Sequence, residues 1–205
     1  MLKTIVNRLF RKKVVYGSDF FADAWFREWL QLRLVLAAML SSEPEWKSIL
    51  DFGCGPGVMI DLMRDKGVDY MGCDYSVEAR QLYLKHFGKF PDYYVTNLEE
   101  SAISSKDVML AFDVLEHMLD DEIEGLLKKV SSISELLFNI SRARGIAGHI
   151  NLKSDLEWIT FMRKQGYEFQ DDRTRKLRII YTQMRPGSPD AWDKNLFLFQ
   201  RIGDR

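Results

Sequence analysis

The stretch LDFGCGPG, residues 50–57, decides how this sequence folds. It continues a short apolar run over residues 49–52, places three glycines at every second position, and leads into an amphipathic segment. This order predicts a buried strand that turns through a glycine loop into a helix. A side chain in that loop would obstruct a bound ligand, so the glycines indicate a place where a ligand approaches the backbone.

An acid follows the next apolar run. Residues 70–73 predict a second strand, and Asp74 comes directly after it. An acid about 20 residues beyond such a glycine loop is placed to accept hydrogen bonds from the two hydroxyls of a ribose. The dinucleotide fingerprint needs a third glycine where this chain has Val58, which disfavours NAD. The two features together predict a site for a nucleoside cofactor.

Short apolar runs and amphipathic stretches alternate along the rest of the chain. This alternation predicts a doubly wound α/β domain over residues 46–205, with a mostly parallel seven-stranded sheet. The expected strands are residues 49–52, 70–73, 93–95, 108–112, 136–140, 167–170 and 196–202, and the expected helices are 58–66, 77–87, 121–130 and 155–165. Residues 186–189 predict a turn because they contain two prolines and a glycine.

Residues 1–45 are expected to form an N-terminal helical segment. Apolar residues recur at helical spacing over residues 2–10, and the other side of that helix is basic. Its apolar face must dock on its own domain, on a second subunit or on a membrane surface. A second helix is expected over residues 19–40, ending before Pro44.

The composition is that of an ordinary globular domain. The 205 residues are 46% hydrophobic and 29% charged, with a net charge of −1. The near-neutral balance argues against binding nucleic acid by phosphate neutralisation alone. Cys54 and Cys73 are too few for a disulfide framework, and no apolar run approaches the roughly 20 residues of a membrane span. We therefore expect a cytoplasmic protein, monomeric or homodimeric, for which nucleic acid is an unlikely partner.

Three motifs in order resemble the class I S-adenosylmethionine-dependent methyltransferases of the small single-domain type. They are D-x-G-x-G-x-G from Asp51, CDYS at residues 73–76 and FDVLEHM at residues 112–118, and the resemblance covers residues 48–202. It implies S-adenosylmethionine as cofactor and Asp74 as the ribose ligand. It also implies cofactor contacts from the loop residues Asp51, Gly53, Cys54, Gly55 and Gly57, from Tyr75, Asn97 and Leu98 beside the adenine, and from Tyr16 in a lid.

Asp113, Glu116 and His117 share one face if a helix or a helical turn begins at Asp113. Three interpretations stay open: they pin loops, they line the acceptor pocket, or they bind a divalent cation together with His149. The last arrangement is similar to the E-x-x-E-H motif plus distal histidine of small-RNA 2′-O-methyltransferases and ubiquinone-pathway O-methyltransferases. Asp113 replaces the first glutamate and shortens the reach by one methylene, so we expect no metal.

The stretch GHINLKS at residues 148–154 resembles small methyltransferases that act on sugars or secondary metabolites. Methyl transfer requires alignment of donor and acceptor, and a hydroxyl acceptor must also lose its proton. His149 is the first candidate for this base, His117 the second, and Asp113 a third catalytic candidate, whereas His86 is expected to be structural. Arginines and lysines of residues 142–185 are usually a solvated face; if they are functional, they lie on the acceptor side and suit an acidic acceptor.

The predicted function is methyl transfer from S-adenosylmethionine to a hydroxyl, or an amine, of a small molecule or carbohydrate. Methylation of RNA or protein, and a catalytically silent scaffold, are the alternatives.

Overall fold

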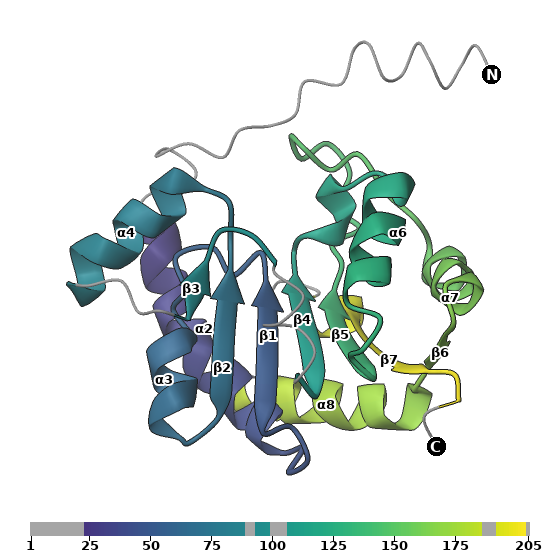
Figure 1. Ribbon diagram of the computed structural model, residues 1–205, viewed down its shortest axis with the longest axis horizontal. Coiled ribbons are helices and arrows are strands. Elements are labelled where there is room, and N and C mark those ends of the chain that lie inside the picture. The colour runs from purple at the N-terminus through teal and green to yellow at the C-terminus, as the bar shows by residue number, and fades with distance from the viewer. Residues whose placement is uncertain (1–22, 89–92, 99–105, 186–191, 204–205) are drawn as a thin grey trace.

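The sheet of this protein has seven strands in the order β3-β2-β1-β4-β5-β7-β6. The computed structural model describes residues 23–88, 93–98, 106–185 and 192–203 (Figure 1). The strands are β1 Ser48–Phe52, β2 Asp69–Cys73, β3 Tyr94–Val95, β4 Val108–Phe112, β5 Glu135–Asn139, β6 Tyr167–Phe169 and β7 Leu196–Arg201. The first five are parallel, and β7 runs antiparallel to both β5 and β6. The predicted doubly wound, mostly parallel sheet is confirmed.

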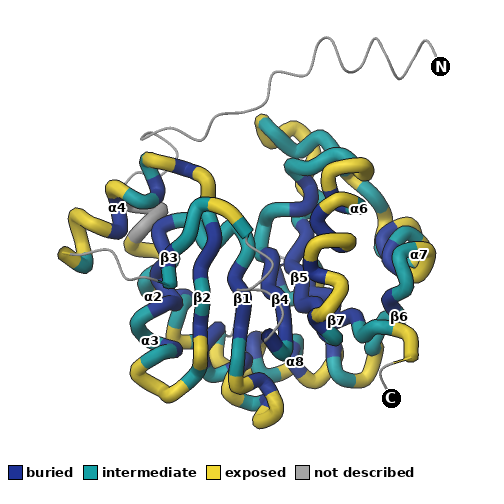
Figure 2. The backbone as a smooth tube through the Cα atoms, in the orientation of Figure 1, coloured by how far each residue is buried: buried dark blue, intermediate teal, exposed yellow. Residues whose placement is uncertain are grey.

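Helices cover both faces of the sheet. They are α2 Asp23–Ser41, α3 Ile60–Asp65, α4 Val77–Phe87, α6 Asp120–Lys129, α7 Asp155–Lys164 and α8 Asp171–Met184, with short 3-10 turns η1 Leu115–His117 and η2 Asp193–Asn195. One core cluster includes α2, α3, α4 and α8, and the other includes α6 and α7. The central strands are buried on both faces for this reason (Figure 2).

Local sequence signals set several helix ends. The Ser76 hydroxyl accepts a hydrogen bond from the Ala79 amide at 3.1 Å and begins α4, and Gly88 ends it with a φ of +82°. Ser154 and Glu157 form a reciprocal capping box at the start of α7. α3 begins at Ile60 rather than at residue 58, because residues 57–59 still belong to the glycine turn.

Helix α8 was not predicted, because its abundant charges mask its apolar side. Thr174, Leu177 and Tyr181 are nevertheless buried at helical spacing, and α8 packs against α2 and β7. The helix lies along the amino-terminal end of the parallel strands (Figure 1).

The sequence placed Arg173 and Lys176 near the acceptor side. In the structure these two residues of α8 lie elsewhere. The Arg173 guanidinium donates to Glu43 at 2.6 Å and to Glu135, which begins β5, and Lys176 pairs with Glu43 at 2.8 Å. The Trp46 indole donates to the same Glu135 carboxylate at 2.6 Å. These basic residues therefore anchor a helix at the edge opposite to the glycine loop.

The described part of residues 1–45 shares the main core. Leu36, Met39 and Leu40 of α2 are buried in the same cluster as Ile49 of β1. The expected helix over residues 2–10, Tyr16 and the turn at residues 186–189 lie outside the described residues. Among the helices that the structure describes, none is long and apolar enough to span a bilayer.

Replacing Arg173 with methionine should destabilise the fold more than an equivalent change on the exposed side of α8. Glu135 would stay buried without its cation while Glu43 would keep only Lys176, and removing one partner of a buried pair costs about 3–5 kcal/mol. The control is Arg175→Met, whose partner Asp171 is exposed and whose ion pair is worth at most about 1 kcal/mol. Urea unfolding measures both variants, and equal midpoints would refute an anchoring role for Arg173.

Candidate functional site

The glycine loop after β1 folds back onto the end of β2. Gly53, Gly55 and Gly57 have φ values of +74°, +52° and +65°, in the left-handed region that favours glycine. The Gly53 and Cys54 amides donate to the Cys73 carbonyl at 2.8 and 3.2 Å. A Cβ atom on Gly53 would lie 2.5 Å from Cγ2 of Val114, so this turn also packs closely against the exit of β4.

Asp74, the acid that follows β2, is hydrogen-bonded to this loop. Its Oδ2 accepts a hydrogen bond from the Gly55 amide at 2.8 Å, and its Oδ1 accepts one from the Ser76 amide at 2.8 Å. Burial raises the pKa of Asp74, and these two amides oppose that shift. Each carboxylate oxygen keeps a further lone pair, so Asp74 still has the acceptor capacity that a ribose contact requires.

Asp51 and Cys54 lie on the inner side of the loop. The Tyr70 hydroxyl donates to the Asp51 carboxylate at 2.7 Å, and burial raises the pKa of Asp51 to about 7. Burial and the nearby carboxylates raise the pKa of the Cys54 thiol well above its usual value. Cys54 and Cys73 are both free thiols, as the sequence predicted. Cys54 is thus a neutral thiol within the loop.

The residues expected beside the adenine lie near the ends of β2 and β3. Tyr75 directly follows Asp74 and is 63% exposed. Asn97 is exposed in the bend after β3, and Leu98 packs partly against the second core cluster. Their contacts with a cofactor remain predictions.

The segment after β4 differs from its prediction. Asp113 does not begin a helix: it has a φ of +54° and is the one non-glycine residue with a positive φ among those the structure describes. Its amide donates to the Asn139 carbonyl at 2.9 Å, which holds the chain beside the end of β5. The helical turn that follows contains only Leu115–His117. The expected helical face shared by Asp113, Glu116 and His117 is therefore wrong.

Glu116 holds the loop that carries His149. It is fully buried, its Oε1 accepts from the Ser141 amide at 2.9 Å, and its backbone carbonyl accepts from Ile150 at 2.9 Å and Asn151 at 3.0 Å. Its Oε2 is buried without a hydrogen-bond partner. Burial and the charge of Asp113 raise the pKa of Glu116 to about 8. The prediction that Glu116 holds a loop by hydrogen bonds is confirmed. Its Oε2 atom takes no part in these bonds.

His117 and His149 face each other with ring centroids 4.8 Å apart. Nδ1 of His117 lies 2.9 Å from the Gly148 carbonyl, and Nδ1 of His149 lies 3.0 Å from the Ala143 carbonyl. A carbonyl can only accept, so Nδ1 carries the proton in each neutral ring and Nε2 is the nitrogen with the acceptor lone pair. Burial lowers the pKa of His117, which favours this neutral form.

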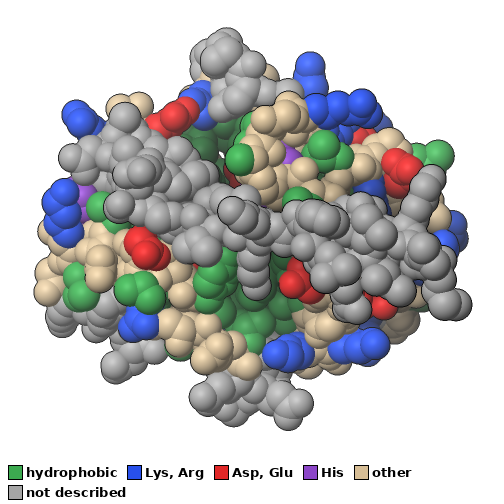
Figure 3. Space-filling view, turned by 90° about the horizontal axis from the view of Figure 1, so that it is seen from above, with side chains coloured by type: hydrophobic (Ala, Val, Ile, Leu, Met, Phe, Trp, Pro, Cys, Tyr) green, Lys and Arg blue, Asp and Glu red, His purple; other side chains and the backbone are tan. Residues whose placement is uncertain are grey.

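Among the residues that the structure describes, one group of side chains could hold a metal ion. The ligand atoms of Glu116, His117 and His149 all lie within 4.8 Å of one another. Asp113 is not part of this group, although the sequence included it. Seen from above the carboxyl ends of the strands, a histidine and hydrophobic side chains border a hollow in the surface (Figure 3). His86 lies on the exposed side of α4, away from the other two histidines.

Two buried polar residues near the end of β5 were not predicted from the sequence. Asn139 ends β5 with no exposed surface, and Trp192 precedes η2 with 6% of its surface exposed. Asn139 Oδ1 and Trp192 Nε1 have no hydrogen-bond partner. The asparagine that closes the apolar run of residues 136–139 was a signal for such a site, because a polar residue in a buried strand needs a partner.

The sheet order, the glycine loop and the acid after β2 define a class I methyltransferase fold. Residues 21–171 match the family described as "Methyltransferase domain". The chain belongs to this family of S-adenosylmethionine-dependent methyltransferases.

Curated relatives include ubiquinone biosynthesis O-methyltransferases. That of Thiobacillus denitrificans is 32% identical over 98 residues, which cover 45% of this chain and 39% of the relative. That of Mesorhizobium japonicum is 30% identical over 103 residues, covering 45% and 41%. The match therefore spans about two fifths of the relatives' length.

Solved structures share the fold at low sequence identity. The magnesium protoporphyrin IX methyltransferase of Synechocystis PCC 6803 with bound SAH has a TM-score of 0.58 and 15% identity, covering 97% of this chain and 99% of that one. A TehB-like SAM-dependent methyltransferase of Corynebacterium glutamicum has a TM-score of 0.56 and 13% identity, covering 87% and 97%.

Proposed function

We propose that this protein transfers a methyl group from S-adenosylmethionine to a hydroxyl of a small molecule in the cytoplasm. One juxtaposition carries the proposal: the glycine loop joined to Asp74 lies at the same edge of the sheet as the facing imidazoles of His117 and His149. The first can hold a nucleoside cofactor and the second can accept a proton. The O-methyltransferase names of the curated relatives and the SAM and SAH complexes of structural neighbours support the same reaction.

The cofactor would bind across the ends of β1 and β2. Asp74 would accept hydrogen bonds from the ribose hydroxyls, and the loop from Gly53 to Gly57 would face the methionine part. Tyr75, Asn97 and Leu98 would flank the adenine. The raised pKa values of Asp51 and Asp74 support a cationic ligand here, because a positive charge stabilises both carboxylates.

The reaction is an in-line displacement. The acceptor oxygen bonds to the methyl carbon, the carbon–sulfur bond breaks, and its electron pair stays on sulfur as S-adenosylhomocysteine leaves. Nε2 of His149 takes the hydroxyl proton, and the Ala143 carbonyl holds the imidazole in the required tautomer. His117 is the alternative base. The loop pinned by Glu116 would align the acceptor with the methyl carbon.

A divalent cation at Glu116, His117 and His149 is a second candidate. Three observations favour it: both imidazoles bond a carbonyl through Nδ1, the Glu116 Oε2 lacks a partner, and the ligand atoms lie within 4.8 Å of one another. Two imidazoles and one carboxylate suit a transition metal or zinc. When bound, the cation would lower the pKa of an acceptor hydroxyl and replace the base.

Replacing Asp74 with alanine should weaken the binding of S-adenosylmethionine. Losing a charge-assisted contact to ribose costs about 1.5–3 kcal/mol, or roughly a 10- to 150-fold increase in Kd. Isothermal titration calorimetry measures this change. The control is Asp65→Ala, which alters an exposed acid on α3. Unchanged affinity in the Asp74 variant would remove the ribose assignment.

Replacing His149 with alanine should slow methyl transfer about 10²- to 10⁴-fold, the usual contribution of a general base. Affinity for S-adenosylmethionine and the Tm should stay near those of the parent protein, because His149 bonds only the carbonyl of its own loop. Single-turnover rates test this, with the exposed His86→Ala as control. A variant that keeps most of its rate would shift the base to His117.

Removing metal should leave the rate unchanged if His149 acts as a base alone. The measurement is methyl transfer after dialysis against EDTA, with metal analysis of the protein. Activity that is lost in EDTA and restored by Mg²⁺, Mn²⁺ or Zn²⁺ would establish the cation instead. In that case metal affinity should rise as the pH increases through about 8, the pKa of Glu116, because the carboxyl group must be deprotonated to bind the cation.

A further inference from the structure

Tyr94, the first residue of the edge strand β3, contacts the glycine loop that follows β1. The strand β2 lies between β3 and β1 in the sheet, so the tyrosine side chain crosses β2 to reach this loop. Its hydroxyl donates to the Gly55 carbonyl at 2.5 Å. Tyr94 is buried, and burial raises the pKa of its hydroxyl well above the usual value. The hydroxyl therefore stays protonated and acts as the donor.

A glycine in β2 leaves space beside Tyr94. Gly72 pairs in register with Tyr94, so the two positions face the same side of the sheet. A Cβ atom on Gly72 would lie 2.8 Å from Sγ of Cys54, which means that the loop packs directly on the backbone of β2. A Cβ atom on Gly57 would lie 3.0 Å from Cε2 of Tyr94. Tyr94 therefore contacts the loop twice, with its hydroxyl at Gly55 and with its ring at Gly57.

Gly55 is held by hydrogen bonds on both sides of its Cα atom. Its amide donates to Oδ2 of Asp74 at 2.8 Å, and its carbonyl accepts from Tyr94. Its φ is +52°, and glycine adopts positive and negative φ about equally readily, so the residue itself does not select this conformation. The hydrogen bonds to Asp74 and Tyr94 select it instead.

The Gly55 amide in turn orients the carboxylate of Asp74. Oδ2 of Asp74 accepts from Gly55, and Oδ1 accepts from the Ser76 amide at 2.8 Å, so two separate segments fix the carboxylate. A ribose contact uses the remaining lone pairs of these oxygens, whose directions depend on that orientation. A carboxylate that is already oriented before binding loses less conformational entropy when the ligand arrives.

We propose that Tyr94 is a positioning residue for the cofactor: its hydroxyl fixes Gly55, and Gly55 fixes Asp74 in the orientation that accepts the ribose hydroxyls. Tyr94 acts through the Gly55 backbone and needs no contact with the cofactor. The inference rests on the proposed function, in which Asp74 is the ribose ligand. It adds to the cofactor site a residue from a third strand, which neither the glycine spacing nor the acid after β2 indicates.

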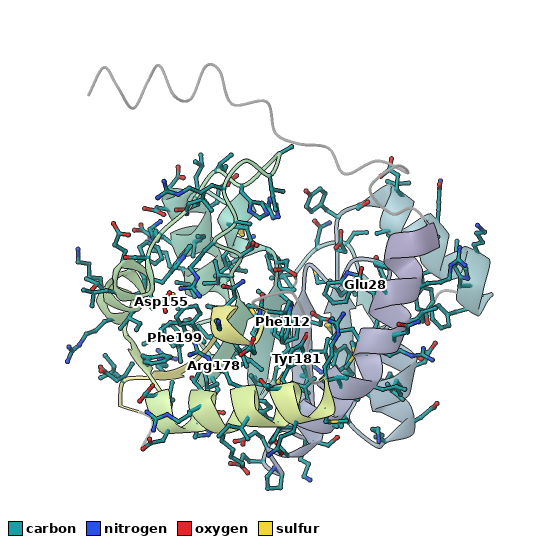
Figure 4. The ribbon with its side chains drawn as sticks, turned by 180° about the vertical axis from the view of Figure 1, so that it is seen from behind. Glu28, Phe112, Asp155, Arg178, Tyr181 and Phe199 are labelled. Carbon is teal, nitrogen blue, oxygen red and sulfur yellow. The ribbon has the colours of Figure 1, made fainter. Side chains whose placement is uncertain are left out.

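Tyr83 offers a matched control for the loss of one buried hydroxyl. Tyr83 and Tyr94 lie in the core cluster that includes α2 and α8, the side of the sheet seen in Figure 4, with ring centroids 5.7 Å apart. The Tyr83 hydroxyl donates to Asp61 of α3 at 2.8 Å rather than to the glycine loop. Tyr83→Phe and Tyr94→Phe each keep the ring and remove one hydrogen bond, so both should lower the Tm. Only Tyr94→Phe should change the loop.

The first test observes the Gly55 amide in the protein without cofactor. Cys54 and Gly55 form the one Cys-Gly pair in the sequence, so cysteine labelled with ¹³C at its carbonyl and glycine labelled with ¹⁵N select this amide by NMR. Its exchange with solvent should become about 3- to 10-fold faster in Tyr94→Phe, the effect of one hydrogen bond, and should stay unchanged in Tyr83→Phe. Exchange in Tyr94→Phe at the rate of the parent protein would overturn the positioning role.

The second test is a double-mutant cycle on the Kd of S-adenosylmethionine, measured by calorimetry. Tyr94→Phe should raise the Kd about 3- to 10-fold, and Tyr83→Phe should leave it unchanged. In protein that already carries Asp74→Ala, Tyr94→Phe should have little further effect, because its hydroxyl acts through that carboxylate. An equal fold-change with and without Asp74 would show that Tyr94 only packs the loop, and would overturn the proposal.

These outcomes separate the positioning role from the proposed function. If Asp74→Ala weakens cofactor binding and Tyr94→Phe does not, the positioning role fails and the ribose assignment stands. If Asp74→Ala leaves the Kd unchanged, the ribose assignment fails, and the positioning role fails with it even where the Gly55 amide exchanges faster in Tyr94→Phe.

Discussion

The close approach of backbone to backbone at residues 53–57 constrains the whole carboxyl edge of the sheet. Gly53 donates to the end of β2 while its Cα faces Val114 at a distance that leaves no room for a Cβ atom. Gly55 donates to the Asp74 carboxylate from the same turn. Three strand ends are thereby held around one loop, and the chain exits β4 in the direction that leads to Asp113 and His117.

Carboxyl groups with raised pKa values gather along this edge. Asp51, Asp74 and Glu116 come from β1, from the end of β2 and from the turn after β4, and burial is the largest cause of the shift for each. Burying a carboxylate without a compensating charge costs free energy that the rest of the fold must supply. A cationic ligand would recover part of that cost. The edge is therefore suited electrostatically to a positively charged cofactor or a metal ion.

At the amino-terminal end of the parallel strands, the buried carboxylates are paired with cations. There Glu43 and Glu135 are paired with Arg173 and Lys176, and the Trp46 indole completes the set. Paired charges anchor α2 and α8, whereas the carboxyl edge leaves polar atoms of Glu116, Asn139 and Trp192 without partners. Buried ion pairs therefore link Glu43 and Glu135 to α8, and buried polar atoms of Glu116 and Asn139 lack partners near the carboxyl ends of β4 and β5.

The amino-acid sequence by itself determined the strands, their mostly parallel arrangement and the glycine loop with Asp74. These features depend on local hydrophobic periodicity and on glycine and acid at fixed spacing, which a single sequence displays. The same local signals set the caps of α4 and α7. Periodicity was insufficient for α8, whose buried residues are diluted by charges that pair with distant carboxylates.

Only the tertiary structure decided which candidate residues meet. It separated Asp113 from the group of Glu116, His117 and His149, because a left-handed φ at Asp113 replaced the expected helix. It brought Asn139 to Trp192 across 53 residues of sequence, and it gave each imidazole a carbonyl that fixes its tautomer. Loop paths and long-range pairings follow from packing across the whole domain, and no local sequence pattern encodes them.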